Sequence, residues 1–214
     1  MNKKQDNARF DQNFSSDWIQ HLETETHWRL YWNQMSLIFD DIKPNERILE
    51  IGKGNGFTSN YLKSKKINVV TMDIDNDKKP DIVADILTHD WGGNIYDRIL
   101  AFEVFEHIPY CDFLQVLGKL STACKYLYFS VPVNEKIWMH LDVQMPKNKK
   151  LCLKIVTKRK KIRSKYHYWE INTGVSRRRL TQDLQNSAFK ICKQKKVLSK
   201  QFFKLASVDE SVML

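Results

Sequence analysis

Three of the seven glycines in the chain stand at alternate positions in one short segment, at Gly52, Gly54 and Gly56. An apolar strand is predicted immediately before them, at residues 48–51, and a helix is predicted immediately after them, from Phe57. A glycine turn between a strand and a helix lets the backbone approach a nucleoside-bearing ligand, because no Cβ stands in the way. Such turns also often need positive φ, which glycine adopts readily. The segment therefore predicts an α/β fold with a ligand at this turn.

The spacing of the glycines differs from that of a dinucleotide-binding turn. A Gly-x-Gly-x-x-Gly turn would place its third glycine at position 57, which is Phe57. The chain has instead Glu-x-Gly-x-Gly-x-Gly, with Glu50 two residues before the first glycine. This pattern resembles the first motif of class I methyltransferases that depend on S-adenosylmethionine (SAM). The resemblance implies SAM as the cofactor, with Glu50 and the three glycines among its binding residues.

Two further acids follow predicted strands at places that support this resemblance. The strand at 67–72 leads to Asp73, where a carboxylate can accept hydrogen bonds from both hydroxyls of a ribose. A short third strand leads to Asp85, which the resemblance places at the adenine amino group. The apolar neighbours Ile74 and Ile86 are then expected to contact the cofactor. The alternatives are a solvated turn residue for Asp73 and a helix or turn cap for Asp85.

The fourth predicted strand, at 96–102, runs into the sequence Phe-Glu-Val-Phe-Glu-His-Ile-Pro. This run resembles a signature that follows the fourth strand in many small-molecule methyltransferases. It implies cofactor contacts from Phe102 and Glu103. His107 is a candidate catalytic residue, and it can equally line the cofactor site or pack in the fold.

Alternating strands and helices predict a doubly wound, mostly parallel sheet. A fifth strand is predicted at 126–132, and a helix at 176–186 precedes two strands at 189–198 and 202–208 that form a hairpin. The class I methyltransferase fold has seven strands in the order 3-2-1-4-5-7-6, with this C-terminal hairpin antiparallel.

The predicted domain organisation has two parts. A helical cap at 1–43 precedes a SAM-binding domain at 44–214, which carries a basic insert at about 133–170. The aromatic-rich helix predicted at 15–41 either lies over the cofactor pocket or packs against the edge of the sheet.

The charge of the chain is concentrated in one place. The protein has a net charge of +10, and ten Lys or Arg with no Asp or Glu lie between Lys147 and Lys165. Alternating apolar residues at Leu151, Leu153 and Ile155 predict a strand or a hairpin arm there. Such a segment favours an anionic partner. The candidates are an acidic acceptor, nucleic acid and an anionic membrane surface. The alternative is a solvated insert that only aids solubility.

The sequence after the basic segment, His-Tyr-Trp-Glu-Ile-Asn, is predicted to border the substrate pocket. It resembles a motif that follows such inserts in a subset of small bacterial methyltransferases. His167 can act there as a general base toward a hydroxyl or an amine. It can equally hydrogen-bond Glu170 or the backbone and hold the insert in place.

Several classes of protein are disfavoured. The sequence contains neither an apolar run long enough to span a bilayer nor an N-terminal signal peptide, and its four cysteines are scattered. Reduced thiols, no metal site and a cytoplasmic location are therefore expected. The chain also lacks the Asn/Asp-Pro-Pro-Tyr/Phe motif of base-amine methylation and the Pro-Cys nucleophile of cytosine C5 methylation.

Three functions are consistent with these features. The favoured one is SAM-dependent O- or N-methylation of a small or glycan-linked, anionic acceptor. The alternatives are an RNA-directed methyltransferase that holds phosphates with the basic insert, and a non-catalytic binding module that retains the fold.

Overall fold

A computed structural model describes residues 23–92, 96–146 and 149–209 of the protein. Trp18 of the predicted N-terminal helix and Lys147 of the basic segment lie outside the described residues. Within the described residues, no helix combines the length and the hydrophobicity needed to cross a membrane.

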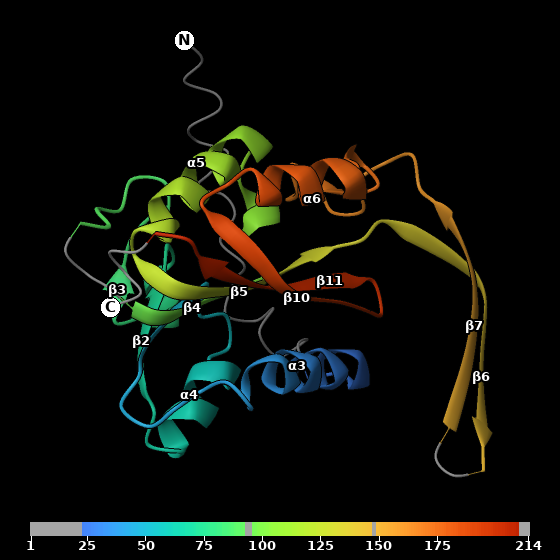
Figure 1. Ribbon diagram of the computed structural model, residues 1–214, viewed down its shortest axis with the longest axis horizontal. Helices are drawn as coiled ribbons and strands as arrows, with labels where there is room; N and C mark the ends of the chain where they lie inside the picture. Colours follow the sequence, from blue (N-terminus) through green and yellow to red (C-terminus); the bar gives the residue numbers. More distant parts are fainter. Residues whose placement is uncertain (1–22, 93–95, 147–148, 210–214) are drawn as a thin grey trace.

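The centre of the protein is a seven-stranded sheet with the order β3-β2-β1-β4-β5-β11-β10 (Figure 1). The first five of these strands pair in parallel, whereas β11 is antiparallel to both β5 and β10. This order and the antiparallel hairpin confirm the predicted fold class. The strands of the sheet are β1 (Arg47–Ile51), β2 (Asn68–Asp73), β3 (Ile82–Val83), β4 (Tyr96–Phe102), β5 (Cys124–Pro132), β10 (Phe189–Val197) and β11 (Lys200–Ser207).

Helices cover both faces of the sheet, as Figure 1 shows. Helices α3 (Glu25–Ile38) and α4 (Phe57–Ser64) lie on one face, and α5 (Tyr110–Ser121) and α6 (Arg177–Gln185) lie on the other. Helix α5 buries Phe113, Val116, Leu117 and Leu120, a spacing that places all four on one side of a helix. Two 3-10 turns, η2 (Asn76–Lys78) and η3 (Phe105–His107), follow β2 and β4.

Alternating side chains of the strands feed two hydrophobic clusters, one on each face. Leu127 and Phe129 of β5 join the cluster that includes Phe113 of α5, while Tyr128 joins the cluster that includes Ile38 of α3. Successive side chains of a strand point to opposite faces, so a strand covered on both sides is apolar throughout. This is why β5 is apolar at most of its positions, with Lys125 and Ser130 as the exceptions.

The basic insert forms a long two-stranded arm made of β6 (Glu135–Met145) and β7 (Lys149–Lys158). The arm leaves the body directly after β5 and extends well beyond the sheet in Figure 1. Of the strand or hairpin arm that the alternation at Leu151, Leu153 and Ile155 predicts, the structure shows the hairpin. The chain returns to the body through the short strands β8 (Glu170–Ile171) and β9 (Gly174–Val175).

The base of the arm is anchored by the buried residue Asn134. Its backbone N–H donates to the Ile171 carbonyl at 2.8 Å, and its Nδ2 donates to the Lys161 carbonyl at 2.7 Å. These bonds join the start of the arm to the segment that follows it. The two ends of the basic insert are therefore held together at its root.

Candidate functional site

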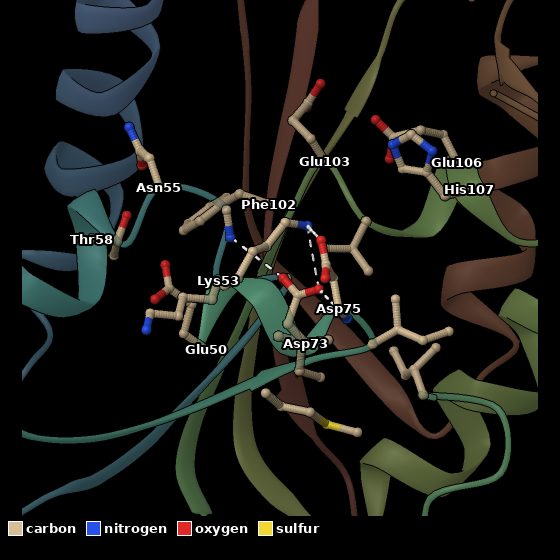
Figure 2. Close-up of a pocket in the computed structure, with 18 of the residues that line it drawn as sticks. Glu50, Lys53, Asn55, Thr58, Asp73, Asp75, Phe102, Glu103, Glu106 and His107 are labelled. Carbon is tan, nitrogen blue, oxygen red and sulfur yellow. Dashed lines mark hydrogen bonds and ion pairs between the residues drawn. The ribbon is translucent and has the colours of Figure 1, made fainter. Parts of the chain in front are cut away.

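A cavity of about 910 Å³ lies at the carboxyl ends of β1, β2 and β4. Ligands of open α/β sheets bind at this edge, where loops leave the strands. Figure 2 shows Glu50 on one side of the cavity, Glu106 and His107 on the other, and Asp73 between them. With the exception of Gly56, every residue predicted to bind the cofactor or to act in catalysis lines it.

The glycine turn has the backbone conformation that the sequence predicts. Gly52, Gly54 and Gly56 have φ angles of 76°, 54° and 74°. A Cβ on Gly52 would lie 2.6 Å from Cγ2 of Val104, so this position excludes larger residues on packing grounds as well. Gly56 is the N-cap residue of α4 and is not among the residues that line the cavity.

The acid Asp73 at the end of β2 is nearly buried and belongs to a small polar network. Its Oδ1 accepts from the backbone N–H of Asp75 at 3.0 Å and from Nζ of Lys78 at 3.3 Å. Its Oδ2 accepts only a long bond, 3.5 Å, from the backbone N–H of Gly54. Asp75 and Lys78 were not predicted from the sequence, although a second acid two residues after a strand end was the available signal.

Asp85 turns the chain after β3, because its Oδ1 accepts from the backbone N–H of Leu87 at 2.9 Å. Asp85 therefore caps a turn, as one of the two sequence-based alternatives predicts. It also lines the cavity, so the turn cap does not exclude contact with a ligand. Ile86 is buried beside it, whereas Ile74 stays 48% exposed. Together these residues form an apolar slot with one carboxylate.

Glu50 is buried under the glycine turn. Its Oε2 has no hydrogen-bond partner among the described residues. Burial raises the pKa of Glu50 to about 7, against the smaller opposing effect of hydrogen bonds from Ser59. A buried carboxylate with an unmet oxygen at a cavity wall is suited to receive a cationic group of a ligand.

Glu103, after β4, is held by partners from two other strands. Ser130 of β5 donates to its Oε1 at 2.7 Å, and Lys200 of β11 forms an ion pair with it. Burial lowers the pKa of Lys200 to about 8. Phe102 lines the cavity beside Glu103. Lys200 was not predicted from the sequence, because it lies in the C-terminal hairpin, far along the chain from the motifs.

The two candidate catalytic histidines meet at the far end of the cavity. The ring centroids of His107 and His167 lie 5.0 Å apart, with the rings nearly perpendicular. Nδ1 of His167 lies 2.7 Å from Oε1 of the buried Glu170, and Nδ1 of His107 lies 3.2 Å from the Tyr166 carbonyl. Burial lowers the pKa of His107 to about 4, so this imidazole is neutral at physiological pH.

The carboxylate of Glu106 completes this group. Glu106 is fully buried, and neither of its carboxylate oxygens has a hydrogen-bond partner among the described residues. Burial, followed by a smaller effect of Glu170, raises its pKa to about 8. In the sequence, Glu106 is only one residue of the signature after the fourth strand, since its burial depends on the tertiary fold.

The aromatic helix α3 borders the cavity, which the sequence offered as one of two alternatives. Tyr31 stacks on Phe57 of α4 with ring centroids 4.4 Å apart, and its hydroxyl accepts from Nδ2 of Asn55 in the glycine turn at 2.9 Å. Trp28 and Trp32 remain 53% and 67% exposed. The helix therefore closes the glycine-turn side of the cavity.

The end of the basic insert forms another wall of the cavity. Arg163 and Ser164 line it, and the backbone N–H of Arg163 approaches both Glu170 carboxylate oxygens at 3.3 Å. The guanidinium of Arg163 donates to the Glu135 carbonyl at the root of the arm at 3.3 Å. The site and the arm therefore share residues.

The fold is that of class I methyltransferases. A family described as a methyltransferase domain matches residues 25–194, which is most of the chain, and the chain belongs to that family. The resemblance to class I methyltransferases predicted from the sequence is thereby confirmed. None of the curated proteins matches the sequence significantly.

Solved structures agree on the fold at low sequence identity. A 1,6-didemethyltoxoflavin N1-methyltransferase from Burkholderia thailandensis has a TM-score of 0.63 and 10% identity, covering 97% of this chain and 91% of that one. A glycopeptide N-methyltransferase complexed with S-adenosylhomocysteine has a TM-score of 0.56 and 8% identity, covering 82% and 88%. Magnesium protoporphyrin IX methyltransferase from Synechocystis PCC 6803, with bound SAM, has a TM-score of 0.55 and 13% identity, covering 94% and 90%.

Proposed function

We propose that this methyltransferase transfers the methyl group of SAM to an oxygen or a nitrogen atom of a small or glycan-linked acceptor. The observation that carries the proposal is one continuous cavity that joins the glycine turn and Asp73 to His107 and His167. SAM is already activated, so an enzyme of this class mainly aligns the acceptor and accepts a proton where the acceptor requires it. The cavity offers separate groups for each task.

The half of the cavity near the glycine turn has a partner for each part of SAM. The unmet oxygen of Glu50 can receive the ammonium of the amino-acid moiety, and Asp73 has an oxygen with only one long bond for a ribose hydroxyl. Asp85 and the apolar side chains of Ile74 and Ile86 form a slot that suits adenine. The three glycines let the backbone lie close under the ligand.

The opposite half is suited to the acceptor. His167, held by Glu170, is the better candidate for a general base, because a carboxylate partner stabilises the imidazolium that forms. His107 is neutral but a weak base, since burial lowers its pKa to about 4. Arg163 at the cavity wall provides a cation for an acceptor that carries a phosphate or carboxylate.

The arm supports a second element of the proposal, an acceptor presented at an anionic lipid surface. On one face of the arm, Met139, Leu141 and Val143 pair with Ile155, Leu153 and Leu151, and all six side chains are 39–58% exposed. Lys154 alternates with these apolar residues along β7, and the basic run from Lys158 to Lys161 begins at the end of that strand. Exposed aliphatic side chains next to basic ones are typical of segments that bind anionic membranes.

RNA is a less suitable partner for this arm. Proteins that bind single strands stack bases on aromatic rings. The basic segment between Lys147 and Lys165 contains no aromatic residue. Trp138 of the opposite strand is exposed, but Lys136 already lies over its ring at 4.2 Å. The aliphatic face of the arm would have no role in binding phosphates.

The cofactor half of the proposal is tested by calorimetry of SAM binding. Asp73→Ala should weaken SAM binding about ten-fold or more, as expected for the loss of charge-assisted hydrogen bonds. Asp40→Ala is a matched control, because Asp40 is exposed and outside the cavity lining. Binding of NADH without binding of SAM would overturn the proposal.

Transfer of tritiated methyl groups from SAM to a deproteinised extract of glycans and small molecules tests the acceptor class.

A further inference from the structure

Three side chains with metal-binding atoms converge at the acceptor end of the cavity. Glu106, His107 and His167 each offer one ligand atom, and these atoms all lie within 4.8 Å of one another. Glu106 and His107 belong to the 3-10 turn after β4, whereas His167 follows the basic arm. The fold brings together residues that are far apart in the sequence, which is why no metal site was expected from spacing alone.

The carboxylate of Glu106 is the second observation that points to a ligand. It has no exposed surface, and both oxygens lack a hydrogen-bond partner among the described residues. A buried charge costs free energy unless it is paired or binds a metal. Two imidazoles lie close to it, and a further carboxylate, Glu170, disfavours its ionised form. A bound cation would supply the missing partner.

The two imidazoles are held in the way that metal ligands usually are. Nδ1 of His167 lies 2.7 Å from a Glu170 carboxylate oxygen, and Nδ1 of His107 lies 3.2 Å from the Tyr166 carbonyl. Histidines that bind metals nearly always donate one ring N–H to a carboxylate or a carbonyl, which leaves the other nitrogen as the ligand. Both acceptors come from the segment after the arm, so this segment fixes the orientation of both rings.

We propose that Glu106, His107 and His167 form a binding site for one divalent transition-metal ion at the acceptor end of the cavity. Two imidazoles and one carboxylate suit Zn²⁺, Fe²⁺ or Mn²⁺ better than Mg²⁺ or Ca²⁺, which prefer oxygen ligands. Three protein ligands leave coordination positions for the acceptor, and a bound metal lowers the pKa of an attached hydroxyl. That role rests on the proposed function, whereas metal binding itself does not.

Cobalt is a suitable probe, because Co²⁺ replaces Zn²⁺ in such sites. The full-length protein, freed of metal by a chelator, should bind one equivalent of Co²⁺ and develop visible absorption, and Zn²⁺ should displace it. Glu106→Gln keeps the shape of the side chain and removes the charge, so it should weaken binding about 10- to 100-fold or more. His107→Gln and His167→Gln should also weaken Co²⁺ binding. His89 is outside the cavity lining, so His89→Ala should leave Co²⁺ binding unchanged.

Circular dichroism of each variant separates metal loss from unfolding, and any one folded ligand variant suffices for the test. Absence of a one-to-one complex, or equal Co²⁺ affinity in the wild type and all folded ligand variants, would overturn the site. SAM binding is measured on the same samples. Metal binding without SAM binding would leave this inference intact and refute the proposed function, whereas SAM binding without metal binding would do the reverse.

Discussion

Nδ1 of His167 lies 2.7 Å from the carboxylate of Glu170, which has no exposed surface. The carboxylate fixes the ring so that its other nitrogen carries the lone pair, whether that nitrogen takes a proton or binds a metal. The same carboxylate approaches the backbone N–H of Arg163 at the end of the basic insert. One buried acid therefore connects the conformation of the insert to the chemistry of the site.

The first prediction concerns the histidines. In metal-free protein, His167→Ala should lower methyl transfer roughly 100-fold while SAM affinity stays nearly unchanged, because a positioned general base contributes about this much. His107→Ala should have a smaller effect, since burial already makes this imidazole a weak base with a pKa of about 4. The measurement is transfer of tritiated methyl groups at saturating SAM, together with calorimetry of SAM binding.

Glu170→Gln refines this experiment. The amide can still accept the hydrogen bond from His167 but does not stabilise the imidazolium, so turnover should fall about ten-fold or more. A purely structural role of Glu170 would leave the pH dependence of turnover unchanged. If both single histidine variants keep normal turnover, methyl transfer proceeds by alignment alone and neither histidine is a base.

The central part of the fold could be predicted from sequence because its signals are local. The strand at 48–51, the glycine turn and the following helix are adjacent in the chain, and the structure shows β1, the turn and α4 at these places. The strand order follows from the family resemblance once each strand is recognised. The arm was predicted from the alternation of Leu151, Leu153 and Ile155, which is a two-residue period.

The chemistry of the site was harder to predict from the sequence, because it depends on contacts between segments that are distant in the chain. Lys200 of the last strand forms an ion pair with Glu103. His167 contacts His107, although the whole arm lies between them in the sequence. A single sequence carries no signal for such pairs. The burial of Glu106 and its unmet oxygens cannot be read from the sequence either, because they depend on the tertiary fold.

The second prediction concerns the glycine turn. Gly52→Ala should destabilise the protein by about 1–3 kcal/mol, because alanine rarely adopts the left-handed region. Its Cβ would also lie 2.6 Å from Cγ2 of Val104. Gly118→Ala is the matched control, since Gly118 lies in α5 with nothing within 4 Å of a new Cβ. There the substitution should stabilise by about 0.5–1 kcal/mol.

Urea denaturation measures both variants, and SAM calorimetry is run beside it. Gly52→Ala should also weaken SAM binding, because the turn lies under the ligand, whereas Gly118→Ala should leave it unchanged. Equal stability of Gly52→Ala and the wild type would show that the turn can relax and that the positive φ at this position is not required.

The third prediction concerns Glu50. Burial raises its folded-state pKa from 4.5 to about 7, so the folded protein holds this proton more tightly than the unfolded chain. The stabilisation is fully present below about pH 4.5 and is lost as the pH rises through about 7. Glu50→Gln mimics the neutral form, so the free energy of unfolding of this variant should fall less than that of the wild type as the pH rises over this range. The difference between the two falls should be on the order of 3 kcal/mol at most.

Chemical denaturation at pH values between about 5 and 8 measures this difference. Titrating groups away from Glu50 contribute equally to the wild type and the variant, so the comparison reports on Glu50 and the charges beside it, Lys53 and Asp73. Parallel pH profiles for the two proteins would contradict a raised pKa. At neutral pH the variant should also bind SAM more weakly, if the unmet oxygen of Glu50 receives the ammonium of the cofactor.

The last prediction concerns the basic arm. Replacement of Lys158, Arg159, Lys160 and Lys161 by Gln should weaken binding to phosphatidylglycerol vesicles on the order of 100- to 1000-fold at low salt, since each basic residue near an anionic surface contributes about 1 kcal/mol. The effect should shrink as salt is added, because salt screens exposed charges. SAM affinity should not change, because these four residues are outside the cavity lining. A variant with Lys43, Lys65, Lys190 and Lys193 replaced by Gln removes the same charge from exposed positions elsewhere and should bind vesicles nearly as the wild type does.

Leu141→Ser combined with Leu153→Ser tests the aliphatic face of the arm, and should reduce the part of vesicle binding that persists at high salt. Equal vesicle binding by the wild type and the arm variant would make the insert a solubility feature, and tighter binding of RNA than of vesicles would favour a nucleic-acid partner instead.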